Sequence, residues 1–402
     1  MITNRQIFQN YIAQTSDEPL MLEIEKAEGI YMYTPEGKSY VDLISGVSVS
    51  NVGHRHPKVV SATKEQIDKY MHLMVYGEYI QSPQVKLAEA IVNILPERFE
   101  SCYFVNSGSE ANEGALKLAK RYTKRSKIIA FNNAYHGSTH GVLSVLGNED
   151  FKNAFRPLLP GVSFLDFNDA SQLSQITEEV AAVIVEPIQG EAGIILPEND
   201  FLKKLRAQCD KAGAILIFDE IQTGFGRTGK MFAFEWYDAE PDIITFAKGL
   251  GGGMPIGAFV SSKEIMSKFT HNPVLGHITT FGGHPVSCAA ALASTKVIIE
   301  EKLVENVVEK GLLFKKYLKH KEFKSFRGKG LFWAVELESY DFLRAFLSNS
   351  IELGVVFDWF IFDDNHFRIS PPLIITEQEI KETCSKLIRA VEKTRNELNL
   401  IK

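Results

Sequence analysis

From about residue 100 to residue 260, the chain alternates short runs of β-branched or aromatic residues with longer segments of helical periodicity. This alternation is typical of βαβ units and predicts a mainly parallel sheet flanked by helices. The segments AVIV and AILIF are apolar throughout, which indicates strands that are buried on both faces. We therefore predict seven strands, at 102–105, 128–131, 162–165, 182–185, 215–218, 243–246 and 258–260.

The two ends of the chain have a different pattern. Residues 20–45 alternate like a hairpin, with the turn signal Pro35-Glu36-Gly37 between two runs. After about residue 300, amphipathic helical patterns surround the strand-like segments FWAVELES and FRISPPL. The sequence thus predicts an α/β fold. Residues 56–299 would form a large domain with a mainly parallel seven-stranded sheet, and residues 1–55 and 300–402 would form a smaller α+β domain.

Charge and composition argue against several classes of function. The 402 residues include 44 Lys and Arg against 50 Asp and Glu, a formal net charge of −6 without a long basic run, so we expect no nucleic-acid partner. No apolar run reaches the roughly 18 residues of a membrane span, and the first residues lack a signal-peptide pattern.

The four cysteines are scattered without CxxC spacing, which favours the reducing cytoplasm. His54 and His56 have no further clustered ligands, so no metal is expected.

Polar residues follow the predicted strands, at the edge of a parallel sheet where ligands bind. Ser107-Gly108-Ser109 precedes a helix, and this turn is either an ordinary N-cap or a cup for a phosphate group. Lys248 ends a later strand before the open stretch GLGGGMPIG, where it could form a Schiff base with a cofactor carbonyl. Asp219 ends the neighbouring strand and is the acid that pyridoxal phosphate needs to keep its pyridine nitrogen protonated. In combination, these features predict a pyridoxal phosphate site.

One segment offers a rival interpretation. GFGRTGK at 224–230 satisfies both G-x-x-x-x-G-K and G-x-G-x-x-G, the patterns of phosphate loops and dinucleotide-binding turns. However, Met231 follows where a phosphate loop needs Ser or Thr, and residues 219–223 separate the segment from its strand. We interpret both matches as coincidental.

Several long motifs are spread over most of the chain: GHRHP at 53–57, NSGSEANEGALKLA at 106–119, AYHGST at 134–139, EPIQGEAG at 186–193, FDEIQTGFGRTG at 218–229, AKGLGGGMPIGA at 247–258, TTFGGHPVSCAAA at 279–291 and RISPPL at 368–373. In these motifs the chain resembles the class III aminotransferases. These are pyridoxal phosphate enzymes of fold type I and include ornithine, acetylornithine and 4-aminobutyrate aminotransferases. The resemblance implies pyridoxal 5'-phosphate as the cofactor.

The resemblance also implies roles for single residues. Lys248 looks like the Schiff-base lysine that moves the proton, and Asp219 looks like the partner of the pyridinium nitrogen, so these two are the expected catalytic residues. Gln222 would bind the phenolic oxygen of the cofactor ring, and Tyr135 and Ile221 would cover its two faces. The expected cofactor-binding residues are Ser107, Gly108, Ser109, Tyr135, His136, Asp219, Ile221, Gln222, Lys248 and Thr280.

Four further positions concern the partner subunit and the substrate. Thr280 resembles a residue that completes the phosphate site of the neighbouring subunit, which implies a homodimer with shared active sites. Arg368 resembles the arginine that fixes a substrate carboxylate, and Glu191 resembles the glutamate that covers this arginine when the substrate has no carboxylate there. With Thr279 they form the expected substrate site. If Glu191 covers Arg368 for one substrate and uncovers it for the other, one pocket can accept an ω-amine in one half-reaction and glutamate in the other.

Two positions depart from the ornithine, acetylornithine and 4-aminobutyrate enzymes. Ser138 stands where those enzymes usually carry a carboxylate-binding arginine, and Val47 stands where ornithine aminotransferases carry a tyrosine. A pocket that lacks a fixed cation should bind a second carboxylate less well, unless Arg156 replaces it.

We therefore predict a dimeric aminotransferase that moves the amino group of an ω-amine or a diamino acid derivative to an oxo acid such as 2-oxoglutarate, in a ping-pong cycle. The alternatives are an aminomutase, a decarboxylating transaminase, and a protein that binds the cofactor without catalysis.

Overall fold

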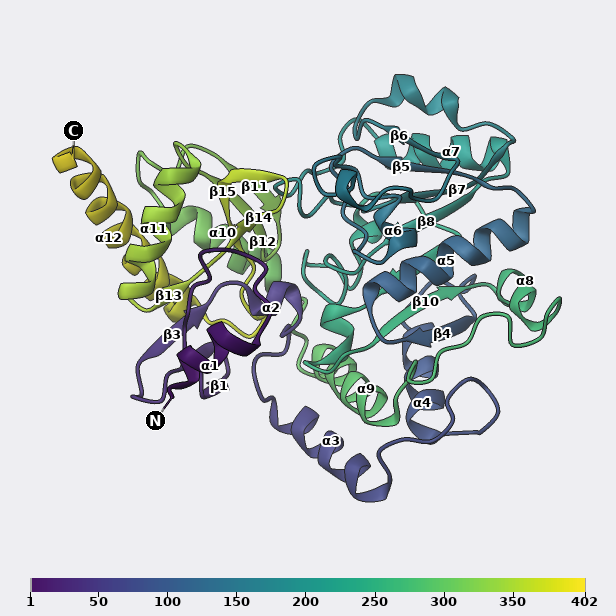
Figure 1. The fold of residues 1–402 in the computed structure, drawn as a ribbon, viewed down its shortest axis with the longest axis horizontal. Helices are drawn as coiled ribbons and strands as arrows, with labels where there is room; N and C mark the ends of the chain where they lie inside the picture. Colours follow the sequence, from purple (N-terminus) through teal and green to yellow (C-terminus); the bar gives the residue numbers. More distant parts are fainter. Residues whose placement is uncertain (1, 402) are drawn as a thin grey trace.

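The computed structural model describes residues 2–401, which form two lobes (Figure 1). The larger lobe contains the middle of the chain. In the smaller lobe, elements from the N-terminus, in purple, lie beside elements from the C-terminus, in yellow. This arrangement confirms the predicted α/β fold with an added α+β domain built from both ends of the chain. The domain boundaries at 55/56 and 299/300 stay predictions.

A seven-stranded sheet forms the centre of the larger lobe. In order across the sheet, its strands are β4 (Ser101–Val105), β10 (Gly257–Ser261), β9 (Ile243–Phe246), β8 (Ile215–Asp219), β7 (Val180–Val185), β5 (Lys127–Phe131) and β6 (Val162–Leu165). Strand β10 runs antiparallel to both its neighbours, whereas the other neighbouring pairs are parallel. Every residue of β7, β8, β9 and β10 is buried, which explains their largely apolar sequences.

Helices cover both faces of this sheet. α5 (Gly108–Thr123) packs on one face against Ala182 and Ile184, and α7 (Phe201–Ala212) packs on the other against Val183 and Val185. Alternate residues of one strand therefore point to opposite faces, as the two-residue period requires. The other helices of this part of the chain are α3 (Pro57–Lys69), α4 (Ser82–Val92), α6 (His140–Leu143), α8 (Lys263–Met266) and α9 (Pro285–Glu300).

The smaller lobe has two sheets. The first has the order β1 (Lys26–Glu28), β2 (Tyr31–Tyr33), β3 (Ser39–Asp42) and β13 (Val355–Val356). The second has the order β11 (Phe326–Lys329), β12 (Phe332–Glu336), β15 (Asp363–Ile369) and β14 (Trp359–Phe360). Its helices are α1 (Asn4–Tyr11), α2 (Ser45–Ser48), α10 (Val307–Tyr317), α11 (Tyr340–Glu352) and α12 (Glu377–Ile401). The predicted turn joins β2 to β3, with Gly37 at a φ of +84°.

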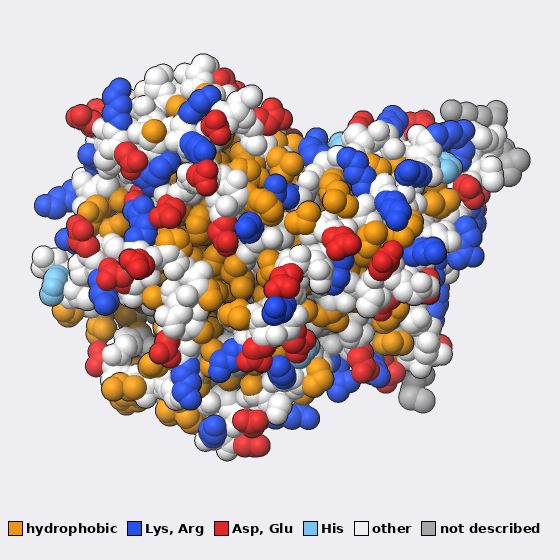
Figure 2. Space-filling model, turned by 180° about the vertical axis from the view of Figure 1, so that it is seen from behind, with side chains coloured by type: hydrophobic (Ala, Val, Ile, Leu, Met, Phe, Trp, Pro, Cys, Tyr) orange, Lys and Arg blue, Asp and Glu red, His pale blue; other side chains and the backbone are white. Residues whose placement is uncertain are grey.

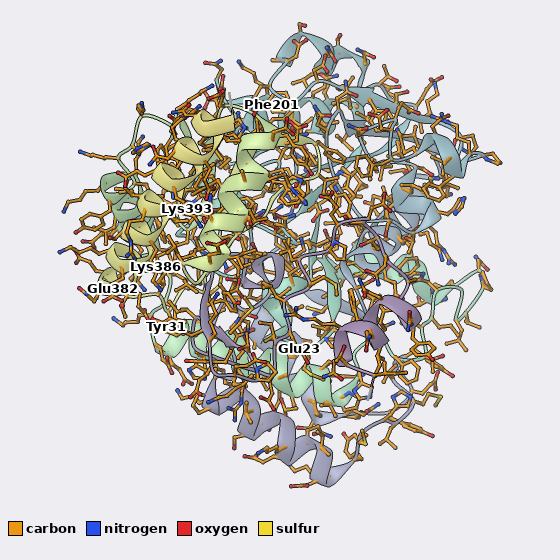
Figure 3. The ribbon with its side chains drawn as sticks, turned by 60° about the vertical axis from the view of Figure 1, so that its left-hand side comes forward. Glu23, Tyr31, Phe201, Glu382, Lys386 and Lys393 are labelled. Carbon is orange, nitrogen blue, oxygen red and sulfur yellow. The ribbon has the colours of Figure 1, made fainter. Side chains whose placement is uncertain are left out.

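The two ends of the chain share one hydrophobic core. Val41 and Leu43 pack in the same cluster as Phe367 and Leu387, and β13 adds directly to β3 as a parallel neighbour. Tyr31 lies beside α12 (Figure 3), where burial and the negative charge of Glu379 raise the pKa of its phenol to about 12. Among residues 2–401, no helix has the length and apolar character needed to cross a bilayer.

Candidate active site

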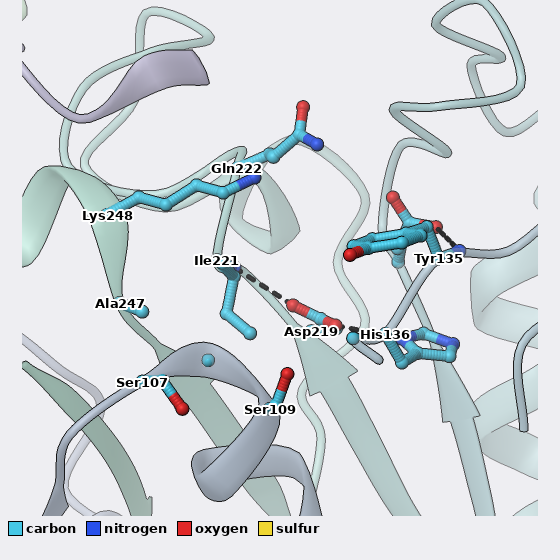
Figure 4. A pocket seen from close by; sticks show the side chains of 12 residues that line it. Ser107, Ser109, Tyr135, His136, Asp219, Ile221, Gln222, Ala247 and Lys248 are labelled. Carbon is cyan, nitrogen blue, oxygen red and sulfur yellow. Dashed lines mark hydrogen bonds and ion pairs between the residues drawn. The ribbon is translucent and has the colours of Figure 1, made fainter. Parts of the chain in front are cut away.

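One cavity lies where the carboxyl ends of the large sheet's strands meet (Figure 4). Its volume is about 180 Å³. The residues that line it are Ser107, Gly108, Ser109, Tyr135, His136, Gly137, Glu186, Asp219, Ile221, Gln222, Ala247 and Lys248. The structure thus brings together every predicted cofactor-binding residue except Thr280.

The N-terminus of α5 forms one end of this cavity. The Ser107 hydroxyl accepts a hydrogen bond from the Glu110 N–H at 3.2 Å, so Ser107 is an N-cap. The N–H groups of Gly108 and Ser109 have no partner within residues 2–401. Gly137, at a φ of +125°, approaches so closely that a Cβ on it would lie 2.2 Å from Ser109 Oγ. The turn is therefore both a cap and a small cup of free donors that fits a phosphate group.

Asp219 is fixed at the end of β8 by three contacts and is only 4% exposed. Its Oδ2 lies 2.8 Å from His136 Nδ1 and accepts a hydrogen bond from Asn112 Nδ2 at 2.7 Å. Its Oδ1 accepts the Ile221 N–H at 3.0 Å. The carboxylate still lines the cavity, so it can meet one more N–H donor there, as a protonated ring nitrogen would supply.

Lys248 follows β9, and its side chain reaches toward Gln222 (Figure 4). Burial is the main reason why its pKa falls to about 8, and the positive charge of Arg368 acts in the same direction. The negative charge of Glu191 opposes the shift. Near neutral pH, a useful fraction of this amine is therefore unprotonated and able to attack a carbonyl. Together with the Asp219 carboxylate and the N–H cup, this donor set fits pyridoxal phosphate.

A buried ion pair adjoins the cavity through Gln222. Arg368 Nη2 donates to Glu191 Oε2 at 2.9 Å, and Gln222 Nε2 donates to Glu191 Oε1 at 2.6 Å. Arg368 Nε also lies 3.2 Å from Asp358 Oδ1. Burial alone would raise the pKa of Glu191, but the charges of Arg368 and Lys248 hold it below its usual value. Glu191 therefore stays ionised and keeps Arg368 covered.

Three polar residues around the site were not among the predicted site residues. Glu186 accepts the N–H groups of Tyr135 at 3.0 Å and Gly190 at 2.8 Å, and burial raises its pKa to about 7. Its position directly after a predicted strand was a usable signal. Asn112, which holds Asp219, is a fully buried polar residue on the inner face of α5, and that unusual placement was a second signal. No pattern in the sequence pointed to Asp358.

Two predicted residues lie elsewhere. Thr279 lines a neighbouring cavity, where its Oγ1 accepts a hydrogen bond from Asn106 Nδ2 at 3.0 Å. Thr280 is exposed and does not reach the cavity of its own chain. Their predicted roles in substrate binding and in the partner's phosphate site stay predictions.

At the positions where this chain departs from the ornithine, acetylornithine and 4-aminobutyrate enzymes, the structure places no charged side chain at the cavity. Ser138 lies beside the Tyr135 phenol. Arg156 does not replace the missing arginine, because its side chain is half exposed and its Nη2 donates to Glu149 Oε2 at 2.6 Å. Val47 lies in α2 and does not line the cavity.

The rival glycine-rich segment does not form a phosphate loop. Residues 224–230 form turns, and a helix does not begin directly after them. Arg227 is fully buried and donates to the carbonyl oxygens of Leu331 at 3.0 Å and Pro371 at 2.6 Å, and to Asn51 Oδ1 at 2.6 Å. The segment therefore connects the two lobes, in agreement with its interpretation as a coincidental match. Within the described part of the chain, no three His, Cys, Asp or Glu side chains gather as a metal site would require.

Comparisons with known proteins extend over nearly the whole chain. The family model described as aminotransferase class-III matches residues 11–391. An acetylornithine aminotransferase of Methanocaldococcus jannaschii is 39% identical over 393 residues, covering 94% of each chain. A [LysW]-aminoadipate semialdehyde/glutamate semialdehyde transaminase of Sulfurisphaera tokodaii is 37% identical, covering 93% of this chain and 96% of its own. The crystallised ornithine aminotransferase from Toxoplasma gondii superposes with a TM-score of 0.90 at 29% identity, covering 97% of this chain and 94% of its own.

Proposed function

Because this chain belongs to the class III aminotransferase family and is a pyridoxal phosphate-dependent transaminase, we propose that it moves the amino group of an ω-amine or a diamino acid derivative to an oxo acid such as 2-oxoglutarate. One observation carries this proposal. The cavity combines a buried amine at Lys248 and a fixed carboxylate at Asp219 with an anion cup, and a covered arginine adjoins it through Gln222.

The cavity residues would hold the cofactor at three points. The free N–H groups of Gly108 and Ser109 would bind its phosphate, and Asp219 would keep a proton on its ring nitrogen. Lys248 Nζ would hold its carbonyl carbon covalently. The bound cofactor supplies an electron sink, which stabilises negative charge on the substrate carbon that bears the amine.

Lys248 would also carry the proton. Its pKa of about 8 lets Nζ accept the proton from the amine-bearing carbon and give it up again near neutral pH. Asp219 supports this step as a fixed carboxylate, because His136, Asn112 and the Ile221 N–H hold its two oxygens in place.

The pair of Glu191 and Arg368 would let one cavity serve both half-reactions. A donor without a second carboxylate leaves the pair intact, and no buried charge loses its partner. Glutamate brings its own carboxylate, which would displace Glu191 and take over the bidentate contact with Arg368. The 2.9 Å contact between two side chains that are 2% to 3% exposed supports a pair that is made or broken as a unit.

A homodimer with shared sites would explain the position of Thr280. The segments 71–80 and 274–281 around it expose large apolar side chains, namely Met71, Leu73, Tyr79, Ile80, Val274, Leu275, Ile278 and Phe281. The segments lie side by side, because the rings of His72 and Phe281 are 4.8 Å apart. Hydrophobic side chains also gather over the middle of the face shown in Figure 2. Exposed apolar surface of this extent is typical of a protein interface.

We also place the protein in the cytoplasm. All four cysteines are free, and three of them are buried, which fits a reducing compartment.

The absorbance of the holoenzyme tests the donor side of this proposal. Glutamate, ornithine, acetylornithine, 4-aminobutyrate, β-alanine and simple diamines are added singly, and each true donor should convert the lysine-bound cofactor to its amine form. Addition of 2-oxoglutarate should then restore the original spectrum. An aminomutase would not pass its amino group to 2-oxoglutarate, and a decarboxylating transaminase would release CO2 from its donor. A spectrum that no amine changes would refute the proposal.

A further inference from the structure

A row of three aromatic side chains leads outward from the cavity. Tyr135 forms part of the cavity lining, and its ring centroid lies 6.5 Å from that of Phe362. The Phe362 ring in turn lies 5.3 Å from Phe151, edge to face at 78°. Tyr135 and Phe362 are half-buried, whereas Phe151 is 43% exposed. A ligand that extends from the cavity toward solvent along this row would therefore meet aromatic rings.

The cations next to this row are already paired with acids. Arg156 and Lys152, which follow Phe151 in the chain, both contact Glu149, at 2.6 Å and 2.9 Å. Arg327 lies 2.9 Å from Asp363, the residue that follows Phe362. A carboxylate at the outer end of a ligand would have to break one of these ion pairs to gain a cation.

The side chain beside the Tyr135 phenol is also uncharged. Ser138 interacts with this phenol through its hydroxyl group, which lowers the pKa of Tyr135 against the larger effect of burial. The outward path from the cavity is therefore bordered by three rings and a hydroxyl group.

The row is anchored to Glu191 in its covering position. The Phe362 N–H donates to the Glu191 carbonyl oxygen at 3.1 Å, and the Ile361 N–H donates to Glu191 Oε2 at 3.2 Å. The same Oε2 accepts from Arg368. The side chain of Glu191 therefore contacts both Arg368 and the backbone next to Phe362, whereas Phe362 itself is held by the Glu191 backbone.

We propose that Phe151, Phe362 and Tyr135 form an aromatic wall that selects amine donors whose end remote from the reacting amine is apolar and uncharged. This inference rests on the proposed transaminase function and narrows its donor class. Such a donor leaves Glu191 on Arg368 and buries its tail against the rings, whereas a donor with a remote carboxylate would lose its hydration without gaining a free cation.

Hexylamine and 6-aminohexanoate test the wall, because they have the same chain length and differ at the remote end. The holoenzyme is mixed with each amine, and separately with glutamate, and kcat/KM for cofactor conversion is measured by absorbance. The wild-type protein should prefer hexylamine by about tenfold or more. Phe362→Ala, which keeps the N–H group that binds Glu191, should lower kcat/KM for hexylamine about tenfold and reduce this preference. Phe362→Leu should have a smaller effect in the same direction.

Two further variants sharpen the test. Ser138→Arg should shift the preference toward 6-aminohexanoate by about tenfold, because it places a guanidinium group beside the wall. Phe155→Ala is the matched control, since Phe155 is a 56% exposed phenylalanine in the same segment as Phe151, and it should leave the preference unchanged.

Two results would contradict the proposal that the aromatic wall selects the donor. One is a wild-type preference for 6-aminohexanoate, and the other is an equal loss with hexylamine, 6-aminohexanoate and glutamate in Phe362→Ala, which would indicate a purely structural role. Either result leaves the transaminase proposal standing as long as glutamate still converts the cofactor. If neither glutamate nor either amine converts the cofactor, the proposed transaminase function is refuted, and the proposed role of the aromatic wall is refuted with it.

Discussion

Replacing Glu191 with Gln tests the switch between the two half-reactions. In the proposed mechanism, glutamate would first have to displace the Glu191 carboxylate from Arg368, at a contact of 2.9 Å between two buried side chains. A hydrogen bond between charged groups contributes about 1.5–3 kcal/mol, so this displacement opposes glutamate by a similar amount. An amine without a carboxylate does not meet this barrier, because the pair stays intact.

The substitution Glu191→Gln removes the competing charge, and the two half-reactions should respond in opposite directions. At about 1.4 kcal/mol per tenfold change, the ratio of kcat/KM for glutamate to that for an apolar amine should rise by about 10- to 150-fold. The value should fall toward the lower end, because Asp358, 3.2 Å from Arg368 Nε, still neutralises part of the arginine charge. The amine should react more slowly, since the uncovered charge of Arg368 repels a cationic donor.

The assay is a stopped-flow measurement of cofactor conversion with each substrate separately. Glu322→Gln is the matched control, because Glu322 is another buried glutamate, 7% exposed, whose Oε1 accepts a hydrogen bond from Arg395 Nε at 2.9 Å in the smaller lobe. The control should lower stability and leave the ratio unchanged. If Glu191→Gln changes both half-reactions by the same factor, the pair is only structural and the reasoning is refuted.

Three further predictions concern the cofactor and the assembly. The rate of cofactor attachment to the apoprotein should rise with pH and level off above about pH 8, because only the neutral Lys248 amine attacks; a midpoint near 10.5, the pKa of an ordinary lysine side chain, would contradict this. Gly137→Ala should weaken cofactor retention in equilibrium dialysis about tenfold or more, since its Cβ would lie 2.2 Å from Ser109 Oγ. Gly37→Ala, also at positive φ but in open space, should not weaken it. Ile80→Glu, at a side chain that is 95% exposed, should give monomers in sedimentation velocity together with cofactor loss, and an unchanged dimer would count against the proposed interface.

Much of the fold could be predicted because periodicity reports burial directly. The strands β7 to β10 of the large sheet are buried on both faces, so their runs are largely apolar, and even the error at β7, predicted from Ala182 and observed from Val180, is small. The mixed origin of the smaller lobe followed from the different patterns at the two ends. The pairing of β13 with β3 did not, because a two-residue strand has no period.

The candidate site could be predicted where its residues directly follow strands. Lys248, Asp219 and the Ser107 turn all do so, and parallel strands bring their carboxyl ends to one edge. Asp358 could not be found this way, because its contact with Arg368 depends on how β14 and β15 fold back on each other. Whether Arg156 could replace the missing arginine also could not be predicted, because its position depends on a side-chain contact with Glu149 that no motif indicates.

We propose that this chain transfers an amino group through Lys248. A ¹⁵N-labelled amine that converts the cofactor in the absorbance assay and unlabelled 2-oxoglutarate are incubated with the holoenzyme, and the product glutamate is analysed by mass spectrometry. We expect one labelled glutamate for each amine consumed by the wild-type protein, and none above background for Lys248→Ala reconstituted with cofactor. Labelled glutamate from the Lys248→Ala variant at the wild-type rate, or loss of amine without labelled glutamate in the wild-type protein, would contradict it.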